Sequence, residues 1–134
     1  MFGLNLIAVI LGLSAAVVLN GVAGIALGLA IATDANAHTE HELEAHFKSE
    51  TASRSLMIQL AILSLVIALL SGALTAWYAP GAPFLNAGFV GLIGMAIGLA
   101  LPSPGFPKAA QKWLARAHLP AALAGAWALL HFGA

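Results

Sequence analysis

The stretch DANAHTEHELEAHFKSETASRS, residues 34–55, interrupts an otherwise apolar chain of 134 residues. It holds all five acidic residues, whereas no charged residue occurs over 2–33 or over 56–107. Over the whole chain 61% of the residues are hydrophobic and only 7% are charged. A soluble domain of this size needs several times more charge to cover its surface. The sequence therefore predicts an all-α integral membrane protein, with residues 1–134 forming a single membrane domain.

Four membrane helices are expected around this polar loop. The first would be about 46 Å long, against an apolar bilayer core of about 30 Å, so it must tilt or extend beyond the bilayer. Prolines break the chain at 80–83 and at 102–107. The last apolar run, 119–132, is too short to span by itself. It can cross if the helix begins near Lys108 and bends at Pro120, and the alternative is a re-entrant or interfacial helix. The predicted spans are 3–33, 56–79, 84–101 and about 109–133.

The polar loop itself contains the signature of a short helix. Thr39 and Glu42 fit a capping box, which predicts a helix over about 40–51. Leu43 and Phe47 would then share one face, suited to the membrane interface. We therefore expect an amphipathic helix on the cytoplasmic side between the first and second spans.

A glycine pattern occurs twice at a constant offset of 70 residues. Glycines at this spacing let a neighbouring helix approach closely. The repetition has two interpretations, which are chance similarity of apolar helices and duplication of a two-helix hairpin. In the second case both glycine faces would serve the same purpose, packing against each other or across a subunit boundary. The predicted helix-packing residues are Gly21, Gly24 and Gly28, matched by Gly91, Gly94 and Gly98.

Few polar groups fall inside the predicted spans. Asn20 is expected to face protein, because an unpaired amide in lipid costs a few kcal/mol. With Gln59, Ser64 and Ser71 it could line a path through a small channel. No carboxylate or basic group lies within the apolar runs, although pumps and ion-coupled carriers normally keep one at depth. His118 is expected at the membrane interface.

The basic residues predict the orientation. All five Lys and Arg fall in the loops 34–55 and 102–118, which a four-helix topology places on one side. The positive-inside rule puts these loops in the cytoplasm and both termini outside, in a membrane that is expected to be a bacterial inner membrane. Lys108, Lys112 and Arg116 form one basic stripe on a helix. We expect the acidic loop to dock on this stripe, the alternative being two independently solvated loops.

His38, Glu42 and His46 follow one another at intervals of four residues, so they share one face of a helix. Imidazole and carboxylate groups at this spacing can hold Zn²⁺ or another divalent cation. The alternative is a solvated acidic face whose histidines change charge near neutral pH. No cofactor is expected apart from this cation.

The sequence contains no catalytic motif and no cysteine, and its formal net charge of zero gives no attraction to nucleic acid. The expected partners are membrane lipids and either other membrane subunits or copies of the same chain. The leading hypothesis is a non-catalytic small membrane subunit or assembly factor of a larger complex. The alternatives are a small homo-oligomeric channel or transporter, and a metal- or pH-responsive protein that uses the His/Glu loop.

Overall fold

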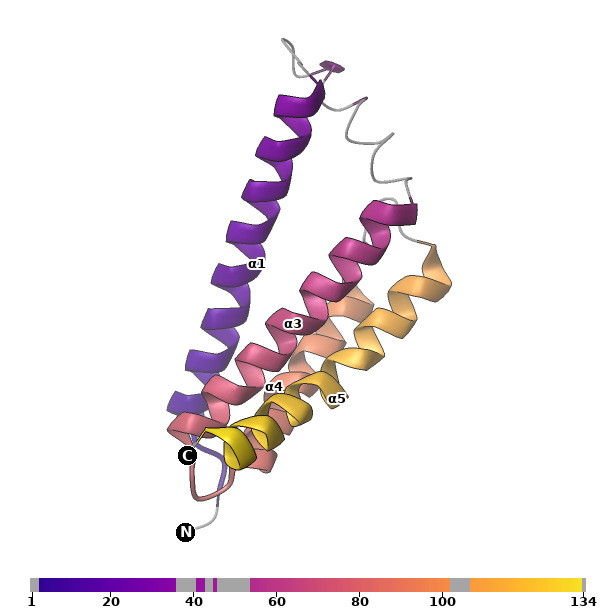
Figure 1. The fold of residues 1–134 in the computed structure, drawn as a ribbon. Helices are drawn as coiled ribbons and strands as arrows, with labels where there is room; N and C mark the ends of the chain where they lie inside the picture. Colours follow the sequence, from indigo (N-terminus) through magenta and orange to yellow (C-terminus); the bar gives the residue numbers. More distant parts are fainter. Residues whose placement is uncertain (1–2, 36–40, 43–44, 46–53, 102–106, 134) are drawn as a thin grey trace.

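The computed structural model describes residues 3–35, 41–42, 45, 54–101 and 107–133. Three of its helices contain segments long and apolar enough to cross a membrane, which are Leu6–Leu27, Met57–Tyr78 and Pro83–Ala100. Three of the four predicted spans are thus confirmed as helices long and apolar enough to cross a membrane, and the span predicted over about 109–133 is not among them. Within the described residues the protein is all-helical, without strands, and its helices are α1 (Leu6–Ala35), α3 (Arg54–Tyr78), α4 (Pro83–Ala100) and α5 (Lys108–Phe132) (Figure 1).

The helix ends follow from polar and proline residues. The Asn5 side chain caps α1, because its Oδ1 accepts a hydrogen bond from the Ala8 amide at 3.2 Å. Pro83 begins α4, where a missing backbone N–H costs nothing. Pro107 directly precedes α5. The two hairpins of the fold are therefore set by residues that cannot continue a helix.

α3, α4 and α5 form a close bundle in which α5 packs against both other helices. Glycine makes this closeness possible. A Cβ at Gly72 would overlap the Ala122 carbonyl oxygen, and a Cβ at Gly125 would overlap that of Leu69. The bundle core is built from small side chains, among them Ala76, Ala87 and Ala126, which are buried together. The backbones of α3 and α5 thus approach each other more closely than larger residues would allow.

α1 is attached to the bundle at its N-terminal end and diverges from α3 toward the other end (Figure 1). The Asn5 amide donates to Asn86 Oδ1 of α4 at 2.6 Å. One helical turn later Ala8 and Val9 are buried. Further along, Val17, Val22 and Ile25 are 70%, 60% and 66% exposed. Only the first third of α1 is therefore part of the common core.

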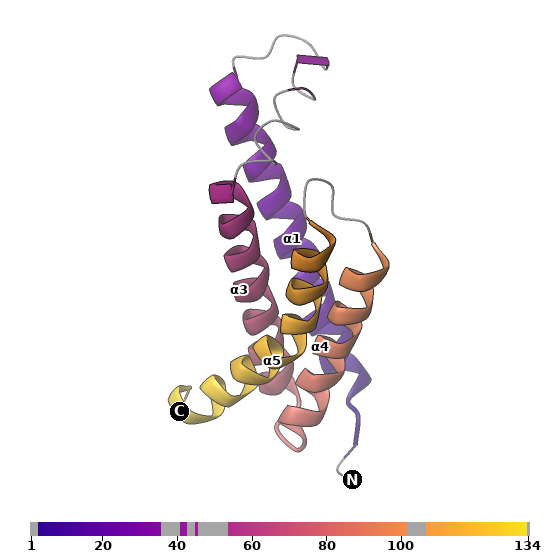
Figure 2. The same cartoon turned by 90° about the vertical axis from the view of Figure 1, so that its right-hand side faces the viewer.

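α5 changes direction along its length, as Figure 2 shows. Pro120 lies inside this helix, and it has no N–H to donate to the Arg116 carbonyl. The bend that the sequence predicts at this proline is thus present. The start of α1 and the end of α5 lie at one end of the molecule, and the end of α4 and the start of α5 lie toward the other (Figure 1).

The predicted amphipathic helix over 40–51 falls almost entirely outside the described residues. Of that segment the structure describes only His41, Glu42 and Ala45.

Candidate functional site

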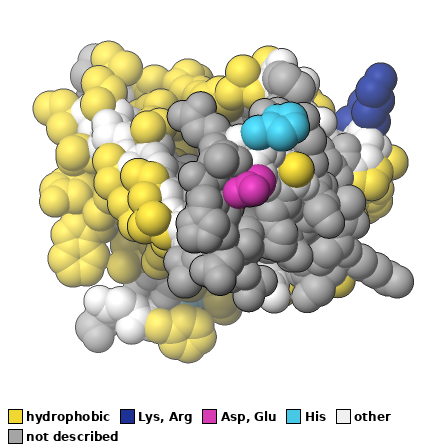
Figure 3. Space-filling model, turned by 90° about the horizontal axis from the view of Figure 1, so that it is seen from above, with side chains coloured by type: hydrophobic (Ala, Val, Ile, Leu, Met, Phe, Trp, Pro, Cys, Tyr) yellow, Lys and Arg dark blue, Asp and Glu magenta, His cyan; other side chains and the backbone are white. Residues whose placement is uncertain are grey.

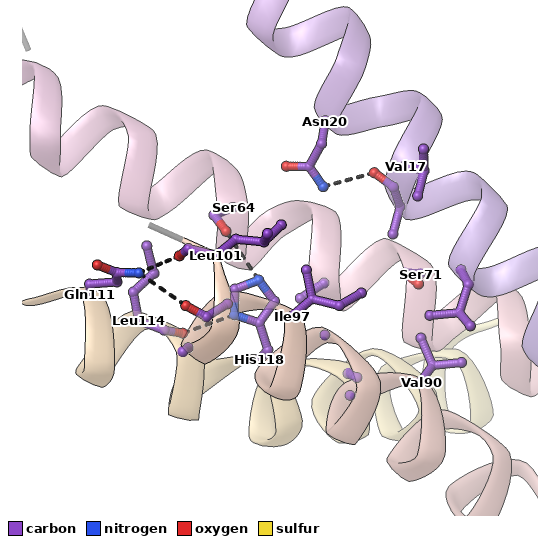
Figure 4. Close-up of a pocket in the computed structure, with 18 residues that line it drawn as sticks. Val17, Asn20, Ser64, Ser71, Val90, Ile97, Leu101, Gln111, Leu114 and His118 are labelled. Carbon is purple, nitrogen blue, oxygen red and sulfur yellow. Dashed lines mark hydrogen bonds between the residues drawn. The ribbon is translucent and has the colours of Figure 1, made fainter. Parts of the chain in front are cut away.

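A cavity of about 500 Å³ lies between α1 and the bundle. All four helices contribute to its wall, and most of the lining side chains are apolar (Figure 4). None of the lining residues is Asp, Glu, Lys or Arg, within the part of the chain that the structure describes. The lining residues run from Leu13 to Asn20 on α1, Ser64 to Ser71 on α3, Val90 to Gly98 on α4, and Gln111 to Ala122 on α5. Cavities of this size and character are typical of small-molecule sites.

Among the described residues that line this wall, His118 is the one ionisable group. Its Nδ1 lies 2.9 Å from the Leu114 carbonyl oxygen, and its Nε2 lies 3.2 Å from Ser64 Oγ. Because a carbonyl oxygen only accepts, Nδ1 carries the hydrogen, and Nε2 of the neutral ring is then an acceptor. The Ser64 hydroxyl donates to it. The backbone bond at Nδ1 therefore determines what the other nitrogen can recognise.

His118 lies between helices, and its expected position at the membrane interface stays a prediction. Ser64 belongs to the segment Met57–Tyr78, which is apolar enough to cross a membrane. The imidazole also packs against α4, where a Cβ at Gly94 would lie 3.4 Å from its Cδ2. α5 starts at Lys108, about 15 Å before His118 along the helix, and the ring is partly buried between α3 and α4. The protein thus has an ionisable side chain beside a membrane segment, which the apolar runs alone did not reveal.

Two amides complete the polar part of the cavity (Figure 4). Gln111 Nε2 donates to the carbonyl oxygens of Gly98 and Leu101, and so ties the start of α5 to the end of α4. Asn20 Nδ2 donates to the Ala16 carbonyl oxygen of its own helix at 2.7 Å. The side-chain oxygens of both amides accept no hydrogen bond from the described chain. They remain available to a ligand.

Three of the four predicted intramembrane polar residues meet at this cavity. Asn20, Ser64 and Ser71 line it, whereas Gln59 is an exposed residue of α3 outside it. Toward the termini the cavity ends where α1 touches α3. There Ser71 Oγ donates to the Gly12 carbonyl oxygen at 2.7 Å, and a Cβ at Gly12 would overlap Thr75 Oγ1.

The two predicted glycine faces have different environments. On α4 the glycines face α5, with the Cβ position of Gly91 2.8 Å from Leu119 Cα and that of Gly98 3.0 Å from Ala115 Cβ. On α1 the Cβ positions of Gly21 and Gly24 have no described atom within 4 Å. Gly28 belongs to the same helix. Packing of the two faces against each other within one chain is therefore wrong, because α5 occupies the face on α4.

The predicted basic stripe is exposed on α5, at Lys108, Lys112 and Arg116. Seen from above, Lys and Arg side chains lie at one edge of the molecule, and hydrophobic side chains cover much of the described surface (Figure 3). Most of the acidic loop expected to dock there lies outside the described residues. The same holds for His38 and His46 of the predicted cation site, while Glu42 is exposed.

A signal for His118 was present in the sequence of α5. Ala115, Ala122, Gly125 and Ala126 are the buried residues of this helix. His118 stands three residues after the first and four before the second, so it shares their face. The face of small residues on α5 therefore indicates that His118 packs toward the neighbouring helices, where it is partly buried.

Comparisons with known proteins do not supply a relative. No protein-family model matches the chain, and no match was found among curated proteins or solved structures. What the protein does must therefore follow from its own residues.

Proposed function

We propose that the protein is a small, non-catalytic membrane subunit or assembly factor that packs α1 against a helix of a partner membrane protein. One observation carries this proposal: Gly21 and Gly24 of α1 have open space at their Cβ positions. Glycine within a helix costs about 1 kcal/mol relative to alanine, so a row of glycines needs a packing reason. No helix of the described chain supplies that reason for Gly21 and Gly24.

Exposed apolar side chains alone would not support this proposal, because lipid tails cover them as well as protein does. A glycine face differs, since it provides a shallow groove into which another helix fits closely. The same spacing on α4 accommodates α5 in this way. By analogy within the molecule, the face on α1 suits a helix from another protein.

We also propose that α5 is a fourth membrane crossing. Its 25 residues give a length of about 37 Å, and it packs along both α3 and α4. Lys108, Lys112 and Arg116 would then reach the headgroups at one surface. With every Lys and Arg toward the loop end, we infer that the loops are cytoplasmic, that both termini are outside, and that the membrane is a bacterial inner membrane.

Cysteine labelling tests this topology, because the chain has no cysteine of its own. An impermeant maleimide added to intact cells should label Gly133→Cys and leave Lys108→Cys unlabelled until the membrane is opened. Labelling of both positions in intact cells would contradict the fourth crossing.

A second candidate function is a small channel or carrier, favoured by the meeting of Asn20, Ser64 and Ser71 at one cavity. The contact of Gly12 with α3 blocks that cavity toward the termini. A path across the membrane would therefore have to open there or run between copies of the chain. Flux through liposomes that contain only this protein would favour the channel over the subunit.

Copurification from native membranes tests the subunit proposal. The wild-type protein should bring down a defined partner chain after gentle extraction, and Gly24→Leu should lose it, because leucine fills the groove. Ala26→Leu is the matched control, since it adds a similar volume about 200° around the same helix. Equal recovery of the partner by both variants would contradict the proposal.

A further inference from the structure

We propose that the cavity between α1 and the bundle binds an uncharged lipid through its hydroxyl group, with His118 and Ser64 holding that group. The proposal concerns a binding site for a small molecule and is independent of the partner helix proposed for α1. It rests on the location of the cavity, on the charge of its walls and on the hydrogen-bonding roles of these two side chains.

The location indicates a ligand that is dissolved in the bilayer. The walls from α1, α3 and α4 belong to Leu6–Leu27, Met57–Tyr78 and Pro83–Ala100, the three segments apolar enough to cross a membrane. A cavity of about 500 Å³ accommodates a headgroup together with part of an apolar chain. Leu13, Val17, Val90 and Ile97 offer an apolar surface to such a chain.

The lack of Asp, Glu, Lys and Arg side chains on the described walls indicates an uncharged headgroup. The basic side chains of α5 are exposed and do not line the cavity. A phosphate would lose its hydration here without gaining a cationic partner, which is strongly unfavourable. Anionic phospholipid headgroups are therefore disfavoured.

The hydrogen bonds at His118 select a hydroxyl group. Nε2 accepts, because Nδ1 donates to the Leu114 carbonyl oxygen. The Ser64 hydroxyl donates across a gap of 3.2 Å, which is long for a bond from a hydroxyl. A ligand hydroxyl can take its place, donating to Nε2 while it accepts from Ser64. A carbonyl or ester oxygen can only accept, so it would leave Nε2 without a donor.

The amide of Asn20 lies on the opposite wall of the cavity, on α1 (Figure 4). Its Oδ1 accepts no hydrogen bond from the described residues, and only one of its two N–H groups has an assigned partner, the Ala16 carbonyl. It can therefore serve a second polar atom of the same ligand. Hydroxyl-bearing lipids with a second oxygen nearby include diacylglycerols and quinols.

Binding of two probe pairs to the full chain in nanodiscs tests the proposal. Each pair contains a form with a free hydroxyl group and a form that has no O–H to donate. The first pair is dioleoylglycerol and its acetyl ester, and the second is decylubiquinol and its oxidised form, decylubiquinone. We expect the hydroxyl form of at least one pair to bind about tenfold more tightly than its partner. Preference within the first pair identifies a glycerolipid, and preference within the second identifies a quinol.

Variants connect the preference to the site. His118→Ala should abolish the hydroxyl preference, and Ser64→Ala should reduce it. His131→Ala is the matched control, because His131 bonds the carbonyl four residues earlier in the same geometry, at 2.9 Å, yet lies exposed outside the cavity. If His118→Ala does not fold, as judged by tryptophan fluorescence, Ser64→Ala decides. Binding without hydroxyl preference, absence of binding by either pair, or a preference that survives in the folded His118 and Ser64 variants would overturn the proposal.

Discussion

α4 and α1 carry the same glycine spacing and use it differently. On α4 the glycine face is filled by α5, to the point where Gly91 and the Leu119 backbone leave no room for a methyl group. On α1 the face at Gly21 and Gly24 is open. A glycine face therefore specifies how closely a helix can be approached, and the rest of the molecule decides which helix approaches it.

The two helices also differ in how they are held. α4 is packed along its length by α5, whereas α1 is fixed at one end by polar contacts from Asn5 to Asn86 and from Gly12 to Ser71. These bonds connect α1 to two different helices of the bundle. Beyond them the Cβ positions of Gly21 and Gly24 have no described atom within 4 Å, which leaves this glycine face open to a partner.

The largest effect is expected from a methyl group inside the bundle. Gly125→Ala should lower the free energy of unfolding by about 3 kcal/mol, because the new Cβ overlaps the Leu69 carbonyl oxygen. Unfolding of the purified protein by SDS in mixed micelles, followed by tryptophan fluorescence, measures it.

Gly24→Ala is the control for the open face. The purified protein should be unchanged or slightly more stable, by about 0.5 kcal/mol, because the added Cβ meets open space and alanine favours the helix. Equal destabilisation by both alanines would show that α1 packs within the chain as tightly as α5 does.

An intermediate effect is expected at the attachment of α1. Asn86→Ala should cost about 2 kcal/mol of unfolding free energy, because a fully buried side chain leaves the Asn5 amide without its acceptor. Spin labels on α1 and α3 should also report a broader distance distribution. Asn20→Ala should leave both measurements near wild type, because within the described residues the Asn20 amide bonds only its own helix.

A smaller effect is expected at Ser71, which forms a second polar contact between α1 and the bundle. Ser71→Ala removes the hydrogen bond to the Gly12 carbonyl oxygen and should cost about 1 kcal/mol in the same unfolding assay. Ser14→Ala, at an exposed position of α1, is the reference. If both alanines behave alike, the polar contact does not hold α1 in place.

Apolar length and proline positions were enough to predict the membrane helices. α3 occupies Arg54–Tyr78 where a span over 56–79 was expected, and α4 occupies Pro83–Ala100 where 84–101 was expected. Such agreement arises because long uncharged runs and prolines act locally. Their effect on helix ends and membrane spans does not depend on which helices pack beside them.

The arrangement of the helices was not predictable in the same way. α1 and α4 are apolar on every side, so their sequences do not mark an inner face. The pairing of Asn5 with Asn86 joins residues 81 positions apart, and no local pattern indicates it. His118 meets Ser64 across two helices for the same reason. Only on α5 does the sequence mark the face that packs inward, by its row of small residues.

The most direct test of the central claim places a photoreactive amino acid at position 24 of α1 and, in a second variant, at position 26. Both proteins are irradiated in native membranes, and every cross-linked chain is identified by mass spectrometry. We predict an adduct with one partner membrane protein from position 24 and lipid adducts from position 26. Lipid adducts alone from both positions, or cross-links only to copies of the same chain, would contradict the account.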